Sequence, residues 1–186
     1  MSGSLSRCQR YPRTNRMDHI NIQHFNTSYG ELVLGSHNDQ LCLCDWHHRK
    51  KRDAVDSRLK KGLKAEFVER DDGVLMEARK QLQEYFNRTR KEFDLPLVLV
   101  GSLFQKKVWN QLLKVPFGRT WSYLQLAENI GDTKAVRAVA GANGANAISI
   151  IVPCHRIIGS NGKLVGYAGG MRTKADLLSL EFDLYN

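Results

Sequence analysis

Apolar and polar positions alternate near the start of the chain and predict three short strands. Ile20 and Ile22 alternate with polar residues, and two further apolar runs lie within residues 32–43. Turn residues at 29–30 and 38–39 separate the three runs. Alternation with period two between turns is typical of strands that are buried on one face. We therefore expect an antiparallel meander of three strands.

A charged stretch and then a helical pattern follow the meander. Residues 47–64 carry eight Lys and Arg against two Asp, with little apolar period. Such a stretch is more often a solvated loop or a frayed helix than a binding surface, and that is our interpretation here. Within 73–87, apolar side chains recur at helical spacing. This pattern predicts an amphipathic helix that covers one face of the meander.

Helix-start signatures dominate the rest of the chain. Ser102 and Ser122 each have a glutamine three residues later, which is the capping-box pattern. The helix that starts at Ser102 should stop at 115–118 (VPFG). After the helix that starts at Ser122, another should run from 132 or 133 to about Asn143. Two short helices joined by a turn that contains Gly favour helix-turn-helix geometry, although such hairpins also occur without DNA.

These patterns divide the chain into three parts. Residues 1–16 are polar, contain four Arg and no acid, and are predicted to be a disordered basic tail. Residues 17–95 form a small α/β domain with the antiparallel sheet and its helix. Residues 96–186 form a mostly helical domain. The fold class that we predict is α+β.

Composition narrows the classes of partner. The 186 residues carry 28 Lys and Arg against 19 Asp and Glu, a net charge of +9, and without the four arginines of residues 1–16 it is +5. A basic surplus favours a polyanion such as nucleic acid or an acidic membrane surface. No apolar run approaches the roughly 18 residues of a membrane helix, and no leader pattern follows the first arginines. We expect a cytoplasmic protein with no membrane partner.

The cysteines are too few and too unevenly spaced for a disulfide scaffold. Cys42 and Cys44 alternate in the third predicted strand and fit the ordinary role of thiols as small buried hydrophobes. Cys154 differs, because it follows an apolar run at 148–153 that predicts a buried strand ending at Pro153. A thiol whose ordinary pKa is about 8.5 needs a neighbouring base or cation to react near pH 7.

His155, Arg156 and Glu181 are the groups that could activate this thiol. Adjacent side chains seldom point at each other, so His155 should reach Cys154 through a turn or a bridging water. Glu181 is an acid in the apolar sequence LLSLEF, on a helix that we expect to begin at Thr173. A buried carboxylate needs a partner; orienting His155 would supply one, and a surface position at the helix end is the ordinary alternative.

A helix of small side chains precedes the thiol. Residues 135–147 contain six Ala and two Gly, with Arg137 as the only charge. Tight core packing explains small residues, but a single Arg on the second helix of a helix-turn-helix suggests insertion into a DNA groove. Asn146 follows Gly144 in a pattern that favours a turn with positive φ, and its side chain could pin the predicted strand to that turn.

Taken together, these motifs resemble the methylated-DNA–protein-cysteine methyltransferase family. The motifs are Pro153-Cys-His-Arg156, Arg137-Ala-Val-Ala-Gly-Ala-Asn-Gly-Ala-Asn146, Gly166-Tyr-Ala-Gly-Gly170, Leu177-Leu-Ser-Leu-Glu181, Phe104-Gln105, Val108-Trp109, Pro116-Phe-Gly118 and Ser122-Tyr123. They cover essentially the whole second domain. The resemblance implies a ribonuclease-H-like first domain and a winged-helix-like second one.

The resemblance also implies a DNA repair function. The protein would bind duplex DNA in the minor groove as a monomer, flip out O6-alkylguanine, and move the alkyl group irreversibly onto Cys154 without a cofactor; O4-alkylthymine is a second conceivable substrate. Flipping fits the physics, because a stacked base is out of reach and an inserted side chain offsets part of the extrusion cost.

By motif position, the resemblance also assigns roles to individual residues. His155 acts as base through a water, Glu181 orients it, Asn146 braces the turn, and Tyr123 helps to rotate the nucleotide and protonates the leaving base. Arg137 would fill the gap, with Ala135 and Ala138 against the groove. The pocket would be lined by Tyr167, Ala168, Gly169, Gly170 and Ile157.

Some features depart from relatives. Many relatives carry Ser where this chain has Ala168, which removes one hydrogen bond to the base. Some relatives hold zinc in the first domain through spaced Cys and His; here Cys42, Cys44, His47 and His48 are clustered without the convergent spacing that a closed site needs, and we expect no metal.

Two other functions suit parts of the sequence. A regulatory DNA-binding module would explain the helices and the charge, but not Cys154, His155 and Glu181 together. A Cys-His hydrolase or acyl transferase would use the same thiol, although no Gly-rich oxyanion loop stands out.

Overall fold

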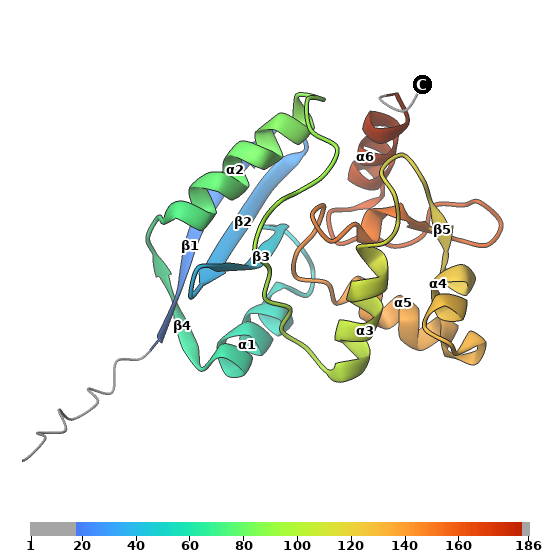
Figure 1. Ribbon diagram of the computed structural model, residues 1–186, viewed down its shortest axis with the longest axis horizontal. Helices are drawn as coiled ribbons and strands as arrows, with labels where there is room; N and C mark the ends of the chain where they lie inside the picture. The colour runs from blue at the N-terminus through green and yellow to red at the C-terminus, as the bar shows by residue number, and fades with distance from the viewer. Residues whose placement is uncertain (1–17, 184–186) are drawn as a thin grey trace, which may run out of the picture.

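The first half of the chain folds into a four-stranded mixed sheet (Figure 1). The computed structural model describes residues 18–183, so the predicted tail at 1–16 lies outside the described residues. Strands β1 (Asp18–Thr27), β2 (Gly30–His37) and β3 (Gln40–Trp46) form the expected antiparallel meander. The prediction lacked a fourth strand, β4 (Ala65–Glu69), which pairs with β1 in parallel and completes the order β3-β2-β1-β4.

A helix, not a loop, connects β3 to β4. Helix α1 (Arg52–Leu63) occupies most of the basic stretch, which corrects the interpretation of 47–64 as a solvated loop or frayed helix. Its buried side chains are Val55 and Leu59, one turn apart, and they pack on the face of the sheet that carries Ile20 and Val33. A two-residue stripe among charges gives little apolar period, yet a parallel crossover requires a connection of this kind.

The opposite face of the sheet is covered by helix α2 (Gly73–Phe86), as the pattern at 73–87 predicted. Asp72 caps it, since its side chain accepts a hydrogen bond from the backbone N–H of Leu75. Leu75, Ala78, Leu82 and Tyr85 pack against Leu32 and Leu34 in the larger of two apolar clusters. That cluster extends into the second half of the chain, so the two halves share a core.

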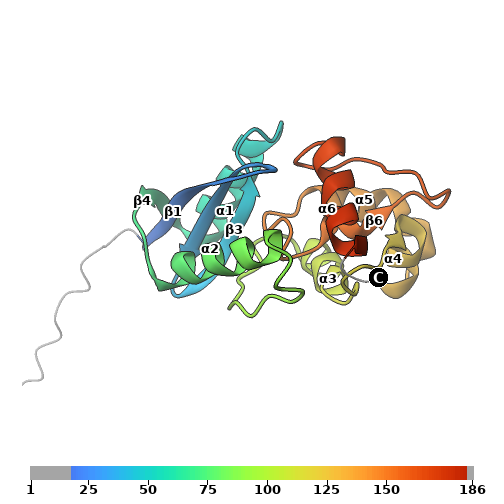
Figure 2. The same cartoon turned by 90° about the horizontal axis from the view of Figure 1, so that it is seen from above.

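The second half is mostly helical (Figure 2). Helices α3 (Leu103–Leu112) and α4 (Tyr123–Asn129) begin at full capping boxes on Ser102 and Ser122, which confirms both predicted starts. The 3₁₀ turn η1 (Thr133–Ala135) leads into α5 (Val136–Gly144), as expected. Helix α6 (Met171–Asp183) begins two residues before the expected Thr173. Short strands β5 (Trp121–Ser122) and β6 (Ile157–Ile158) pair in parallel.

The apolar run 148–153 is not a strand, contrary to expectation. Ile148 forms a single bridge with Cys44 of β3, and the chain then turns through Ile150, whose φ is 72°. Hydrophobicity alone does not separate a buried strand from a buried turn. The 3₁₀ turn η2 (Cys154–Arg156) follows directly.

The two halves meet along β3. The connecting segment forms a bridge between Leu41 and Leu97, and the predicted boundary between residues 95 and 96 falls next to it. The backbone N–H of Cys44 donates to the carbonyl of Ala147 at 2.9 Å. Across the described residues no helix combines the length and apolar character of a membrane span.

Candidate active site

Cys154 lies at the start of η2 with 3% of its surface exposed. Burial raises the pKa of its thiol, while a hydrogen bond from Asn146 and the positive charges of Arg49 and Lys174 act in the opposite direction. The resting side chain is therefore a thiol, and forming the thiolate requires a nearby base.

His155, the residue after Cys154, forms a buried pair with Glu181. The Nε2 of His155 lies 2.7 Å from Oε1 of Glu181, the partnership that the sequence predicted. Burial lowers the pKa of His155 against the opposing effect of Glu181, so the ring is neutral near pH 7. With Nε2–H donating to the carboxylate, Nδ1 carries the lone pair. That atom is buried and has no hydrogen-bond partner in the described part of the chain.

Glu181 is held as a carboxylate by several donors. Arg156 donates from Nε at 2.8 Å and from Nη2 at 3.0 Å, and the hydroxyl of Tyr85 donates at 2.8 Å. The backbone N–H of Gly118 adds a longer contact at 3.3 Å. Burial alone would raise the pKa of Glu181, but His155 and Arg156 outweigh it and lower the pKa from 4.5 to about 2. The charge that orients His155 is therefore permanent at neutral pH.

Asn146 closes the turn that leads to the thiol. Its Oδ1 accepts from the backbone N–H of Ile148 at 2.9 Å, and its Nδ2 donates to the carbonyl of Val152 at 2.9 Å. The side chain thus spans the whole turn, the bracing arrangement expected of it, although the braced segment is a turn and not a strand. Asn143 adds a contact of 3.4 Å to the carbonyl of Cys154.

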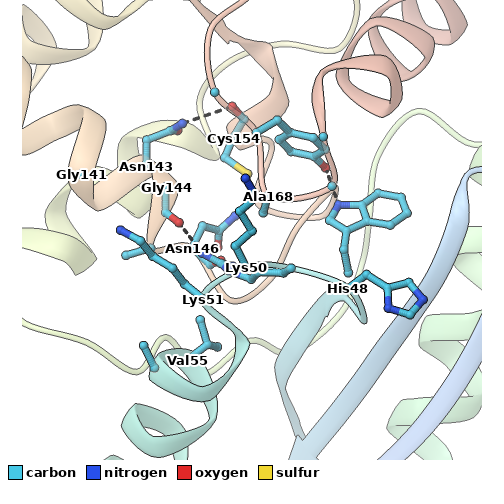
Figure 3. Close-up of a pocket in the computed structure, with 18 of the residues that line it drawn as sticks. His48, Lys50, Lys51, Val55, Gly141, Asn143, Gly144, Asn146, Cys154 and Ala168 are labelled. Atoms are coloured by element: carbon cyan, nitrogen blue, oxygen red, sulfur yellow. Dashed lines mark hydrogen bonds between the residues drawn. The ribbon is translucent and has the colours of Figure 1, made fainter.

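A cavity of about 770 Å³ opens in front of Cys154. Figure 3 shows Asn143 and Asn146 beside the thiol, with Lys50 and Lys51 from the first half of the chain reaching into the same space. The lining includes the predicted pocket residues Tyr167, Ala168, Gly169 and Gly170, and also Tyr123. Ile157 is different, because it is fully buried and does not line the cavity.

Tyr123 stands at the cavity wall with its hydroxyl 3.5 Å from Nδ2 of Asn143 and from the carbonyl oxygen of Val165. Burial raises its pKa, and the neighbouring Cys154 raises it further. Its hydroxyl is therefore protonated at neutral pH and can donate a proton.

Helix α5 presents small side chains and one cation to solvent. Arg137 and Ala138 are exposed and Ala135 is half-buried, whereas Val139 on the opposite side belongs to the core. The small side chains of Ala138 on α5 and of Ala135 at the end of η1 leave the exposed Arg137 accessible to solvent.

Three functional positions in the first half escaped the sequence reasoning. Trp46 lines the cavity and donates from Nε1 to the hydroxyl of Tyr167 at 3.0 Å. Arg49 donates to the carbonyl of Asn146 at 2.8 Å and also to that of Gly144, while Arg58 donates to the carbonyl of Ala145 at 2.7 Å. Arg49 and Arg58 lie in the basic stretch, where the sequence does not distinguish them from solvated charges, and Trp46 is the last residue of the apolar strand β3.

Lys174 is a further buried cation that the sequence did not indicate. Its Nζ donates to the carbonyls of Ile157 at 2.5 Å and Val165 at 2.7 Å, so it ties α6 to the segment that forms one wall of the cavity. Burial lowers its pKa to about 8, and the nearby Cys154 acts in the other direction.

The cysteines of the first half point away from one another. Cys42 belongs to the cluster beneath α1, and Cys44 to the larger cluster on the other face of the sheet. Burial raises the pKa of Cys42 to about 12 and that of Cys44 well above its ordinary value. Because they lie on opposite faces, the two thiols cannot share one ion.

Comparison with known proteins extends over both halves of the chain. Residues 22–99 match the family model of the 6-O-methylguanine DNA methyltransferase ribonuclease-like domain, and residues 103–182 match that of the DNA binding domain. A methylated-DNA–protein-cysteine methyltransferase of Methanosarcina acetivorans is 42% identical over 157 residues, which is 84% of this chain and 95% of the relative. That of Mycobacterium tuberculosis is 51% identical over 111 residues, 60% of this chain and 67% of the relative.

Solved structures agree with the sequence matches. The crystal structure of the O6-methylguanine methyltransferase of Mycobacterium tuberculosis superimposes with a TM-score of 0.75 at 39% identity, covering 88% of this chain and 93% of the other. The OGT of that organism in complex with DNA gives 0.76 at 38% identity, covering 89% and 94%. This chain belongs to the 6-O-methylguanine DNA methyltransferase family, and it is a DNA-binding repair protein that acts by alkyl transfer.

Proposed function

We propose that the alkyl group passes from O6 of an extrahelical guanine to Sγ of Cys154. The observation that carries the proposal is the buried, unpartnered Nδ1 of His155, the residue directly after Cys154, while Nε2 is fixed on Glu181. A water between Nδ1 and the thiol can carry the proton, and this agrees with a thiol that is protonated at rest.

The transfer then balances without a co-reactant. The thiol proton passes through water to Nδ1 of His155, the bond from Sγ to the alkyl carbon forms, and the bond from that carbon to O6 breaks. Tyr123 gives its proton to the leaving base. It then takes up the proton that His155 received from the thiol. The products are a neutral base and a thioether, a bond that water does not hydrolyse under ordinary conditions. Each protein molecule therefore acts once.

We expect α5 to bind in the minor groove of the DNA. Arg137 would fill the gap left by the flipped base, and Ala135 and Ala138 would pack against the groove. The exposure of Arg137 and the small side chains around it support this arrangement. O4-alkylthymine is a second candidate substrate. The cytoplasmic location and the monomeric state stay predictions from the sequence.

Stoichiometry tests the assignment of Cys154. Excess duplex with O6-methylguanine should yield at most one repaired base per protein and one methyl group on the peptide that contains Cys154. Cys154→Ala should transfer none, while Cys42→Ala, a buried thiol on the far side of β3, should still transfer one. Repeated turnover with unmodified Cys154 would refute the proposal, and so would a methyl group on another residue.

A further inference from the structure

Two histidines and a glutamate meet at one end of the sheet. They are His24 on β1, Glu31 on β2 and His47, the residue after β3. The Nδ1 of His24 lies 2.6 Å from Oε1 of Glu31, and the Nδ1 of His47 lies 3.9 Å from Oε2 of the same carboxylate. One ligand atom from each residue falls within 4.8 Å of the other two.

Strand pairing, not a loop, holds these residues in place. His24 pairs with Val33, two residues from Glu31, so both side chains leave the same face of the β1–β2 hairpin. The backbone N–H of His47 donates to the carbonyl of Glu31 at 2.9 Å and sets it beside that residue. A preorganised ligand set loses little conformational entropy when an ion binds.

A simple ion pair explains only part of this arrangement. His24 alone would satisfy Glu31, yet His47 approaches the other carboxylate oxygen, and the two imidazole rings lie 5.3 Å apart between centroids. The three side chains are 40%, 27% and 42% exposed in the order His24, Glu31, His47, so an ion can reach them from solvent.

Two imidazole nitrogens and one carboxylate form a ligand set that suits Zn²⁺ and its first-row neighbours. We propose that His24, Glu31 and His47 bind one zinc-class divalent ion, with water in the remaining coordination position. The site uses no thiol, and it is separate from the buried Cys42 and Cys44. It was missed from sequence because its members are distant until the hairpin forms.

The site borders the cavity that contains Cys154. Glu31, Trp46 and His48 all line that cavity, and Figure 3 shows the His48 ring pointing away from Cys154 on the side of the strands. A bound dication would replace the negative charge of Glu31 by net positive charge near the cavity. If the proposed DNA function holds, this charge favours the phosphate backbone; metal binding itself does not depend on that function.

Zinc titration of the metal-stripped full chain, followed by calorimetry and by histidine ring shifts in NMR, tests the site. We expect shifts at His24 and His47, and a Co²⁺ absorption spectrum of nitrogen and oxygen ligation without a thiolate band at this site. His24→Ala and His47→Ala should each weaken Zn²⁺ binding here by more than about tenfold, a change of roughly 1.4 kcal/mol. His19→Ala removes an exposed histidine at the other end of β1 and should leave the affinity unchanged.

Thermal unfolding gives a second readout on the same proteins. Zinc should raise the unfolding midpoint of the wild type and of His19→Ala, because an ion that binds only the folded state stabilises it, and this gain should be absent in His24→Ala and His47→Ala. The proposal is overturned if the wild-type rings do not shift with Zn²⁺, or if both variants bind and respond as the wild type does. Neither readout uses alkyl transfer, so failure of the repair assignment would leave this test intact.

Discussion

Arg49 donates to Oδ2 of Asp45 at 2.7 Å, and both side chains are almost completely buried. The same guanidinium binds the carbonyl of Asn146, while the other oxygen of Asp45 accepts from the hydroxyl of Ser149 at 3.1 Å. This ion pair therefore connects the end of β3 to Asn146 and to Ser149 in the turn that precedes Cys154. The first half of the chain thus takes part in shaping the active site.

Arg49→Ala should lower the free energy of unfolding by about 3–5 kcal/mol, because it leaves the Asp45 carboxylate buried without its cation. Methyl transfer should also slow, since the turn of Asn146 loses its support. Urea denaturation and single-turnover kinetics measure the two effects. Arg52→Ala breaks a partly exposed pair with Asp56 and should cost less than about 1 kcal/mol. Equal costs for the two variants would contradict the assigned role of Arg49.

Glu181→Gln should change how stability depends on pH. In the folded protein the pKa of Glu181 is lowered from 4.5 to about 2, so its contribution is fully present above about pH 4.5 and is lost as the pH falls towards 2. The shift corresponds to roughly 3 kcal/mol. Unfolding at pH 7 and pH 3 should show a large deficit for Glu181→Gln at pH 7 and a smaller one at pH 3. The exposed Glu66→Gln is the control, and a deficit that is constant with pH would count against the assignment.

Gly169→Ala should disturb the cavity wall through Trp46. A Cβ at position 169 would lie 2.6 Å from Nε1 and Cε2 of the buried indole, so the ring must move and lose its hydrogen bond to Tyr167. We expect a stability cost of about 1–3 kcal/mol and slower reaction with O6-benzylguanine. Gly73→Ala, where a Cβ meets no described atom within 4 Å, is the control. Combining Gly169→Ala with Trp46→Phe should recover part of the loss, and no recovery would argue that Gly169 acts independently of Trp46.

Arg137→Ala should separate base flipping from chemistry. If Arg137 occupies the vacated stack, the variant should repair duplex DNA far more slowly than the wild type but react almost normally with free O6-benzylguanine, which needs no flipping. Salt must be fixed, because phosphate contacts make DNA affinity salt-dependent. Lys134→Ala removes a nearby exposed cation and should affect duplex repair less. Equal losses on the two substrates would exclude the stacking role.

Local signals in the sequence predicted local structure well. The capping boxes at Ser102 and Ser122 marked two helix starts because the capping residue and its glutamine are only three positions apart. The parallel pairing of β4 with β1 could not be found in this way, since Asp18 and Ala65 meet only after α1 has crossed the sheet. The turn at 148–153 is set by the side chain of Asn146, and its apolar composition hid that constraint.

The same distinction applies to the site. Cys154, His155 and Glu181 belong to motifs that the sequence shows directly, and the two motifs meet through the 2.7 Å contact between His155 and Glu181. Trp46, Arg49 and Lys174 reach the site from other elements, so nothing near them in sequence indicates a role. A buried cation such as Lys174 becomes recognisable only when the carbonyls around it are known.

The contacts along β3 also bear on solubility. β3 is an edge strand, and an unpaired edge with apolar side chains is a template for pairing with other chains and for aggregation. Here the backbone of Leu41 forms hydrogen bonds with Pro96 and Val98, and the backbone of Cys44 forms hydrogen bonds with Ala147 and Ser149. The connecting segment and the active-site turn therefore cover that edge. A fragment that ends near residue 95 would expose it and should self-associate. The turn that positions the reactive thiol thus also shields the sheet from intermolecular pairing.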